Sequence, residues 1–402
     1  MKRIVSFLFL FSLLLAACAP ATELLEPAET IEPTPTLTPA QEPQTEAQAS
    51  VAPQETPLPA IVEAPIIEAP SIINIEMVDQ KHGWGLTETE IVSTDDGGLT
   101  WYDVTPDGLK GVGYLVFADF LDSKRAWVQL PDMNNYPNGG TLYRTSDGGL
   151  TWDRFATPFS GGAFKFVDEK NGWVMADLGV GAGSMGVSIF KTTDGGKTWE
   201  RTYTNDPNIE GASDSLPLGG IKSLILPIDA KTAWVGGVVY APGQVYLFRS
   251  DNSGATWKNI SLSLPSEAVD SELNVQGIVF VSPTEGLLAI RMTSETPMTL
   301  IFSTKDGGMT WSQLPVVFEG YGILETPSAK EMIFYAADQF YVTKDAGKTV
   351  RKITPDVQFG DSILDMSFAN AETGWIVASD VSGEYILYKT ADGGLTWAVL
   401  SR

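Results

Sequence analysis

An eight-residue segment recurs seven times along the 402 residues of this chain. One copy, residues 145–152, reads TSDGGLTW, and the others keep most of its hydroxyl, acidic, glycine and tryptophan positions. The third position of the copies is occupied in turn by Asp96, Asp147, Asp194, Asn252, Asp306, Asp345 and Asp392. The interval between copies is about the length of one four-stranded sheet, a spacing typical of sheets repeated around an axis. The repeat therefore predicts an all-β array of seven units.

Each copy of this segment, called the box below, is expected to form the turn between two strands. An Asp carboxylate accepts hydrogen bonds from the N–H groups of its own turn, and the following glycines supply positive φ. A catalytic or metal-binding carboxylate would not recur in every unit, so the seven box residues are interpreted as turn fasteners. Asn252 agrees with this interpretation, because an amide can form the same turn but cannot act as a general acid.

A second repeated signal lies between the boxes. A short turn followed by Trp opens a strand at Trp84, Trp127, Trp173, Trp234 and Trp375, whereas Leu287 and Ile333 occupy the corresponding positions of units five and six. Each unit thus has strands A, B, C and D, with the box between C and D. The predicted fold is a seven-bladed β-propeller over residues 71–402, closed by packing between blades one and seven. Residues 61–67 could supply an extra edge strand.

The chain begins with features of an exported lipoprotein. Lys2 and Arg3 precede an apolar run that is too short to span a bilayer, so residues 1–17 are interpreted as a signal peptide. The run ends in Leu-Ala-Ala-Cys, which resembles a bacterial lipobox, and Cys18 is the only cysteine. Residues 18–70 are rich in Pro and Glu and are expected to be a disordered tether. We therefore expect a lipid anchor at Cys18 and a location on the outer face of a membrane of the cell envelope.

The pairing of the Trp-opened strand with the box resembles the Asp-box repeat, and in particular the photosystem II assembly and stability factors and their non-photosynthetic relatives. The resemblance covers nearly all of residues 71–402. It implies a seven-bladed propeller that binds other proteins, needs no cofactor and has no enzymatic activity. Val350 replaces the box Trp in blade six, and this makes the sector of blades five and six irregular.

Charge and composition limit the functions that fit. The chain has 50 acidic and 26 basic residues, and its folded part keeps 41 and 24 of them, a net charge of −17. Such a surface makes nucleic acid an unsuitable partner. His82 is the single histidine, which argues against a Ser-His-Asp triad or a multi-histidine metal site. We predict neither a metal nor a cofactor.

Propellers with this repeat also include sialidases, so the arginines were considered as a converging triad. Arg144 and Arg249 share one repeat position with Lys191 and Lys389, and this set is interpreted as exposed strand positions. Arg154 and Arg201 share a second repeat position, two residues after the box Trp, and are interpreted in the same way. Arg125, Arg291 and Arg351 remain, and the Arg-Ile-Pro motif of sialidases is absent. A glycoside hydrolase or a carbohydrate-binding module remains the alternative to a protein-binding scaffold.

The loops opposite the boxes are the predicted ligand face. The B–C and D–A connections are expected to be long and irregular at residues 131–140, 178–186, 204–220, 261–274 and 317–326. The GxGxxG segment at 181–186 has no helix after it and is interpreted as a hairpin. The candidate ligand residues on these loops are Tyr136, Asp206, Glu210, Asp270, Glu272 and Tyr321. We expect a monomer that binds a protein or another cell-surface ligand.

Overall fold

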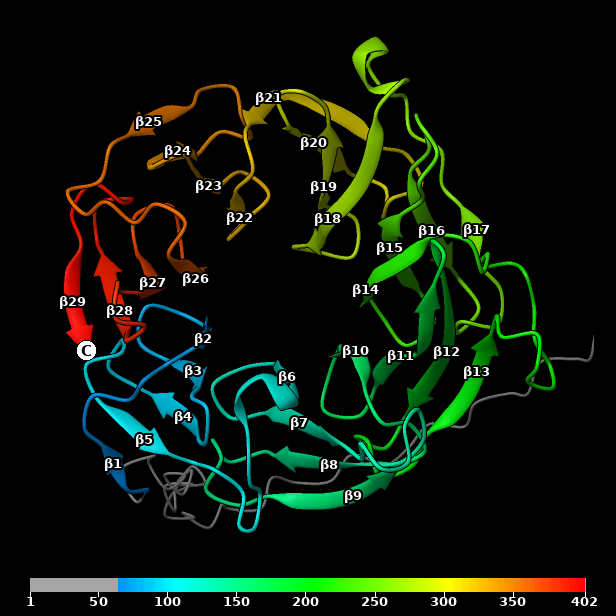
Figure 1. The fold of residues 1–402 in the computed structure, drawn as a ribbon, viewed down its shortest axis with the longest axis horizontal. Coiled ribbons are helices and arrows are strands. Elements are labelled where there is room, and N and C mark those ends of the chain that lie inside the picture. Colours follow the sequence, from blue (N-terminus) through cyan, green and yellow to red (C-terminus); the bar gives the residue numbers. More distant parts are fainter. Residues whose placement is uncertain (1–63, 402) are drawn as a thin grey trace, which may run out of the picture. The chain divides into compact units, whose positions relative to one another are not determined.

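The structure, a computed structural model, describes residues 64–401, which belong to one compact unit spanning Pro57–Arg402. The predicted signal peptide, Cys18 and the tether up to residue 63 lie outside the described residues. Seven antiparallel blades follow one another around a ring, each with its first strand innermost (Figure 1). Blades four and five share one eight-stranded sheet, which the single residue pair Val238–Asn274 joins. The prediction of a seven-bladed β-propeller is confirmed.

Each blade is built from four consecutive strands, as the repeat predicts. Blades one to three comprise β2 (Asn74–Met77), β3 (Gly83–Leu86), β4 (Ile91–Thr94), β5 (Trp101–Asp103); β6 (Phe117–Phe120), β7 (Ala126–Pro131), β8 (Gly140–Thr145), β9 (Asp153–Thr157); and β10 (Gly162–Phe166), β11 (Gly172–Gly181), β12 (Ser184–Thr192), β13 (Glu200–Thr204). A 3-10 turn, η2 (Gly113–Leu115), precedes blade two.

The remaining four blades follow the same order. They comprise β14 (Ile221–Pro227), β15 (Ala233–Val238), β16 (Tyr246–Ser250), β17 (Lys258–Asn259); β18 (Glu272–Phe280), β19 (Gly286–Thr293), β20 (Met298–Thr304), β21 (Ser312–Glu319); β22 (Ile323–Glu325), β23 (Met332–Ala336), β24 (Gln339–Thr343), β25 (Arg351–Ile353); and β26 (Ile363–Phe368), β27 (Gly374–Ser379), β28 (Tyr385–Thr390), β29 (Ala398–Ser401). A second 3-10 turn, η3 (Ser266–Ala268), lies between blades four and five. No helix among residues 64–401 is long and apolar enough to cross a membrane.

The hydrophobic core lies between neighbouring blades. Strand B is buried along its whole length in several blades, as in β3 and β15, because both faces of its sheet are covered by the next sheets. Strand D at the rim is mostly exposed, as in β9. One cluster joins Trp84 of blade one to Phe120 and Val128 of blade two, so the side chains that recur by blade pack between blades.

Three local features differ from the expectations for the chain. Ile66–Ile67, inside the predicted tether, form β1 and pair with β5 as a fifth strand of blade one, which is the edge strand left open above. Residues 178–186 were expected to be a long, irregular connection, but β11 and β12 extend into them past a register shift between Asp177 and Gly179. The hairpin predicted at residues 181–186 is present and turns at Ala182 and Gly183. Most of residues 317–326 likewise belong to β21 and β22.

The ring closes between blades seven and one through side chains that reach the backbone of the neighbouring blade. Asp365 Oδ2 accepts hydrogen bonds from the N–H of Ile75 (2.8 Å) and from Asn74 Nδ2 (2.7 Å). Trp375 Nε1 donates to the carbonyl of Gly97 (2.9 Å). Packing between complete blades therefore closes the ring, as expected for blades that are each continuous in sequence.

Candidate functional site

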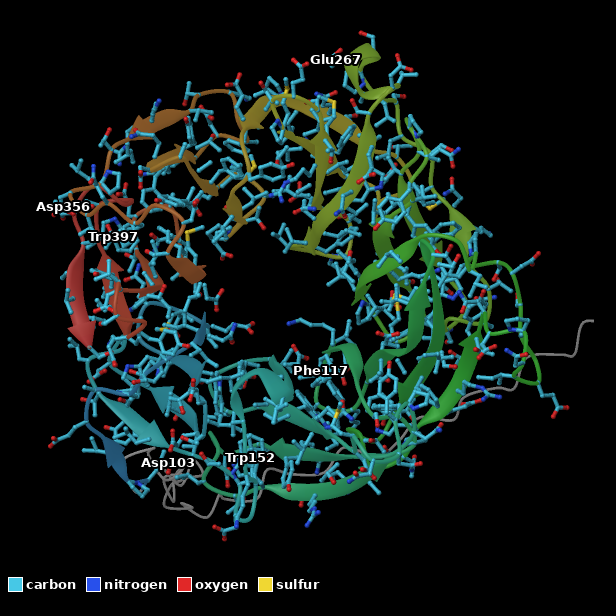
Figure 2. The ribbon with its side chains drawn as sticks, viewed as in Figure 1. Asp103, Phe117, Trp152, Glu267, Asp356 and Trp397 are labelled. Carbon is cyan, nitrogen blue, oxygen red and sulfur yellow. The ribbon has the colours of Figure 1, made fainter. Side chains whose placement is uncertain are left out.

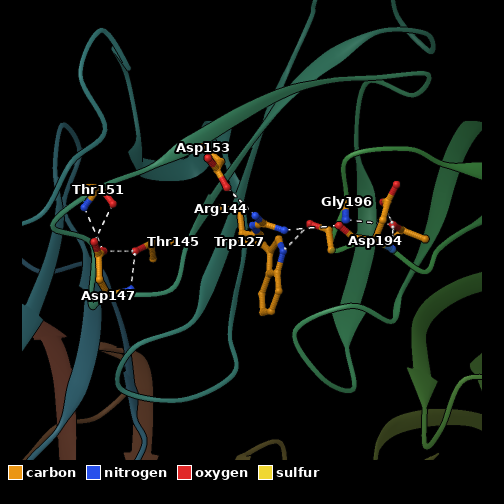
Figure 3. A network of polar contacts seen from close by, with 10 residues as sticks. Trp127, Arg144, Thr145, Asp147, Thr151, Asp153, Asp194 and Gly196 are labelled. Atoms are coloured by element: carbon orange, nitrogen blue, oxygen red, sulfur yellow. Dashed lines mark hydrogen bonds and ion pairs between the residues drawn. The ribbon is translucent and has the colours of Figure 1, made fainter. Parts of the chain in front are cut away.

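The box aspartates are engaged by their own turns. Asp147 Oδ1 accepts hydrogen bonds from Thr145 Oγ1 (2.8 Å) and Thr151 N (3.0 Å), and Oδ2 accepts one from Thr151 Oγ1 (2.6 Å), as Figure 3 shows beside the equivalent Asp194. The hydroxyl and N–H of Thr310 and the hydroxyl of Thr304 lower the pKa of Asp306 to about 2. This arrangement leaves the carboxylates ionised and without a free edge for substrate or metal.

The box of blade four shows what the turn requires. Ser250 Oγ and Thr256 N donate to Asn252 Oδ1, both at 3.0 Å. The amide Nδ2 donates to Thr256 Oγ1 (2.9 Å), where the aspartates accept a bond from the same hydroxyl. In this box the donor and acceptor of the bond to the Thr hydroxyl are exchanged, and the turn keeps its geometry.

The strand-B tryptophans fill the seams between blades, and the basic residues of strand C lie over them. Trp127 Nε1 donates to Gly195 O of the next box (3.1 Å), and Arg144 Nη1 reaches Asp194 O (3.4 Å; Figure 3). Lys191 Nζ lies 4.5 Å from the centroid of Trp173, and burial lowers the pKa of this lysine. The interpretation of Arg144, Arg249, Lys191 and Lys389 as exposed positions is wrong, because all four are at least partly buried at seams.

The A–B turns, which share a face with the boxes, are fastened in a similar way. In each, a side-chain oxygen accepts the backbone N–H groups two and three residues later. These oxygens belong to Asp79, Asp122, Asp168, Asp229, Ser282, Ser328 and Asn370. The box face is therefore a regular array of short turns, each fastened by a side-chain oxygen of its own.

The predicted ligand residues all lie on the connections of the opposite face, called the loop face below. Tyr136 is in the B–C connection of blade two, Asp206 and Glu210 precede β14, Asp270 precedes β18, Glu272 begins β18, and Tyr321 precedes β22. Among the described residues, no hydrogen bond or ion pair joins two of these six. Figure 2 places Glu267 of η3 at the outer edge of the ring. The structure thus distributes the six residues over the loop face and does not gather them into one site.

One part of the loop face presents several exposed apolar side chains. The side chains of Met133, Tyr136, Val180 and Tyr240 are largely exposed on blades two to four and are called the tyrosine patch below. The hydroxyl of Tyr136 donates to Asp177 O of blade three (3.2 Å). A Cβ on Gly183, at the hairpin tip of blade three, would lie 3.2 Å from Cδ2 of Tyr240 in blade four. These contacts link the three blades at this surface.

A cavity of about 480 Å³ lies between blades five and six. Its walls combine apolar side chains with polar groups, which include the guanidinium of Arg291 and the hydroxyl of Thr299. Arg291 Nη2 donates to Gly322 O (2.7 Å), and the guanidinium lies 5.5 Å from the centroid of Tyr321. In the sequence, this cavity is signalled by Leu287. This residue stands at the strand-B position that other blades fill with Trp, and its side chain lines the cavity.

The repeat pattern also did not predict a group of ionisable side chains on the innermost strands. It comprises Glu76, Asp119, Lys165, Glu325 and Asp365, from five different blades. Lys165 Nζ pairs with Asp119 Oδ1 (2.6 Å). Burial, with the charges of Asp365 and Glu76, raises the pKa of Glu325 to about 8, and burial raises that of Asp365 to about 6. Within residues 64–401, no group of three or more His, Cys, Asp or Glu side chains has the geometry to hold a metal ion.

Comparisons with known proteins concern the fold. No family model matches the chain, and none of the curated proteins matches it. Among solved structures, it is similar to YCF48 bound to D1 peptide, at 16% identity and a TM-score of 0.48, over 81% of this chain and 96% of that one. It is similar to the GH74 xyloglucanase from Xanthomonas campestris, at 12% identity and a TM-score of 0.55, over 84% of this chain.

The chain spans only 55% of that xyloglucanase. A PL25 ulvan lyase is also similar, at 14% identity and a TM-score of 0.45, over 84% of this chain and 96% of that one. These solved structures include both binding proteins and enzymes. The likeness to the xyloglucanase, whose TM-score is above 0.5, shows the fold alone and leaves function to the residues of this chain.

Proposed function

We propose that this protein is a lipid-anchored propeller of the cell envelope that binds a protein partner through its loop face and catalyses no reaction. The observation that carries the proposal is the tyrosine patch on blades two to four. Tyr136 is 49% exposed and Tyr240 is 61% exposed, although contacts between blades hold both. Grouped apolar side chains on a rigid surface are typical of protein interfaces, and tyrosines are common anchors there.

The two faces of the propeller differ in a way that supports this choice. The side chains of the box face fasten their own turns, whereas the tyrosine patch offers contact area that no described residue covers. The folded part has a net charge of −17, which favours a partner with a basic surface and an association rate that falls as salt rises. Asp206 and Glu210 would contribute to this steering, so their joint reversal to Lys should weaken binding without changing the melting temperature.

Site-specific crosslinking in the native envelope tests the proposal. A photo-crosslinking residue would replace Tyr136 or Tyr240 on the loop face, and Leu99 or Met309 on the box face as exposed controls. The expected result is one crosslinked polypeptide from both tyrosine positions and none from the controls. Crosslinks that form only from the box face would show that the partner binds the opposite side.

The anchor is tested separately. Cys18→Ser should abolish incorporation of labelled lipid and leave the protein uncleaved or released from the membrane fraction. A mutant that is processed and retained like the wild type would contradict the lipoprotein interpretation. Neither outcome depends on the loop face.

A glycoside hydrolase is the second candidate, and one observation favours it. Burial raises the pKa of both Glu325 and Asp365, and the charge of Asp365 adds to the rise at Glu325, as in the carboxyl pairs of such enzymes. However, Asp365 already accepts hydrogen bonds from Ile75 N and Asn74 Nδ2. Turnover of xyloglucan or aryl glycosides that is lost in Glu325→Gln would establish the enzyme, and inactivity across a substrate panel would favour the binding protein.

A further inference from the structure

The seam between blades five and six lacks the side chain that fills other seams. At the preceding seam, the ring of Trp234 lies directly beneath Gly308 of the blade-five box, where an added Cβ would lie 2.2 Å from Cζ2. Leu287 takes the position of this Trp in blade five and lines the cavity of about 480 Å³ together with Val279, Ile301 and Leu324. A Cβ added at Gly277, which also lines the cavity, would have no atom within 4 Å. Leu287 and Gly277 therefore border space that a larger side chain could fill.

Arg291 enters this cavity without an acidic partner. Three other arginines form ion pairs, Arg125 with Asp122, Arg144 with Asp153 and Arg249 with Asp251. Among the described residues, Arg291 contacts no carboxylate, and its buried Nε has no hydrogen-bond partner. A partly buried guanidinium that has no counter-ion and keeps a buried, unpaired Nε points to an anion supplied from outside.

Thr299 gives an independent indication of the same ligand. It lies directly opposite Arg291 in the ladder between β19 and β20, it lines the cavity, and it is only 1% exposed. Its hydroxyl has no hydrogen-bond partner among the described residues. Buried hydroxyls in native proteins are nearly always paired, so this one is available to a bound group.

We propose that the cavity between blades five and six binds a small monocarboxylate with an apolar body. The guanidinium of Arg291 would hold the carboxylate through paired N–H donors, and Thr299 Oγ1 would donate a further hydrogen bond. The apolar body would lie against Val279, Leu287, Ile301 and Leu324. A single cation matches one negative charge and gives a dianionic phosphate too few donors. Tyr321, 65% exposed above Arg291, borders the site on the loop face.

Calorimetric titration of the purified full-length protein provides the test, with 4-methylpentanoate and hexanoate as ligands and 4-methylpentan-1-ol as the uncharged analogue. The wild type should bind the acids roughly 10 to 100 times more tightly than the alcohol, because charged hydrogen bonds are lost with the carboxylate. Arg291→Gln should remove this preference, and Thr299→Val should weaken acid binding roughly five- to tenfold. Gly277→Val should reduce binding of acid and alcohol alike by filling the cavity.

Arg154→Gln is the matched control, since Arg154 also lies over a tyrosine ring, that of Tyr143, but at an exposed site away from the cavity. It should bind like the wild type. A wild type that binds neither acid, or binds acid and alcohol equally, would overturn the proposal. Acid binding that survives Arg291→Gln unchanged would also overturn it, and a melting curve for each variant separates lost binding from lost folding. The outcome is independent of whether the tyrosine patch binds a protein.

Discussion

Two seams of the same ring are built differently. Between blades seven and one, Trp375 is completely buried and bonds Gly97 of the next box, while Asp365 holds the backbone of β2. Between blades five and six, Leu287 stands where the Trp would be, and a cavity lined by Arg291 and Thr299 remains. The first seam satisfies its polar groups within the protein, and the second leaves some of them unpaired.

The difference shows what the repeated tryptophan does. Its ring fills the seam, and its N–H can bond the next blade, as Trp84 does with Asp122 O (2.8 Å). Loss of one such ring leaves the backbone of the blade unchanged, because the sheet of blade five keeps its ladder. A propeller can thus gain an internal binding site at one seam while the other seams preserve the fold.

The largest expected effect comes from opening the closed seam. Trp375→Ala should lower the free energy of unfolding by about 3–5 kcal/mol, since a fully buried ring leaves a large cavity. Leu287→Ala at the open seam should lower it less, by roughly 2 kcal/mol, because its side chain already borders empty space. Urea denaturation of both variants checks the order, and a larger loss for Leu287→Ala would contradict the comparison.

The Asp of a box turn should contribute less to the free energy of unfolding than the Trp ring at a seam. Asp147→Ala should cost about 1–3 kcal/mol, because it removes the bonds from Thr145 and Thr151. Asp147→Asn should retain most of the stability, since Asn252 forms the same turn in blade four. Thermal unfolding with equal losses in both variants would mean that the carboxylate charge has a role beyond the turn.

The closing seam should also respond to pH. Burial raises the pKa of Asp365 to about 6, above its unfolded value of about 3.9, so its contribution to stability is lost as pH rises between these values. The pKa of Glu325 is raised to about 8, so its contribution to stability is lost as the pH rises further, up to about 8. The box aspartates have lowered pKa values and lose their contribution only below about pH 4.

Lowering the pH from 8 to 5 should therefore raise the melting temperature, by roughly 2–4 °C. Asp365→Asn should remove the part of this rise below about pH 6, and Glu325→Gln the part above it. Melting curves at several pH values provide the measurement. A wild type that is less stable at pH 5 than at pH 8 would contradict the assigned pKa directions.

The smallest effect is expected from filling the open seam. Gly277→Val should change the free energy of unfolding by less than about 1 kcal/mol, because its side chain would enter empty space. Gly237→Val is the control, since a Cβ there would lie 2.0 Å from Ile221 O and force the sheet of blade four to shift. Similar unfolding curves for the two variants would show that the seam at Gly277 is already closed.

The repeat predicted the number of blades, their strand order and the position of each box turn. The seam contacts could not be predicted in this way, because they join residues such as Asp365 and Ile75 that are 290 positions apart. The burial of Lys191 at a seam could not be predicted for the same reason, because the pattern of one strand does not show which residues of the next blade pack against it. Leu287 did signal the irregular sector, but only the structure places Arg291 and Thr299 beside it.

Hydrogen–deuterium exchange measured at both seams in one experiment tests the central claim most directly. In the free protein, amides of β22 should exchange faster than those of β2 and β26, because the seam of blades five and six is incompletely filled. Addition of 4-methylpentanoate should slow exchange in β19 and β22 and leave β2 and β26 unchanged. Equal exchange at the two seams, or faster exchange at β2 and β26, would contradict the account.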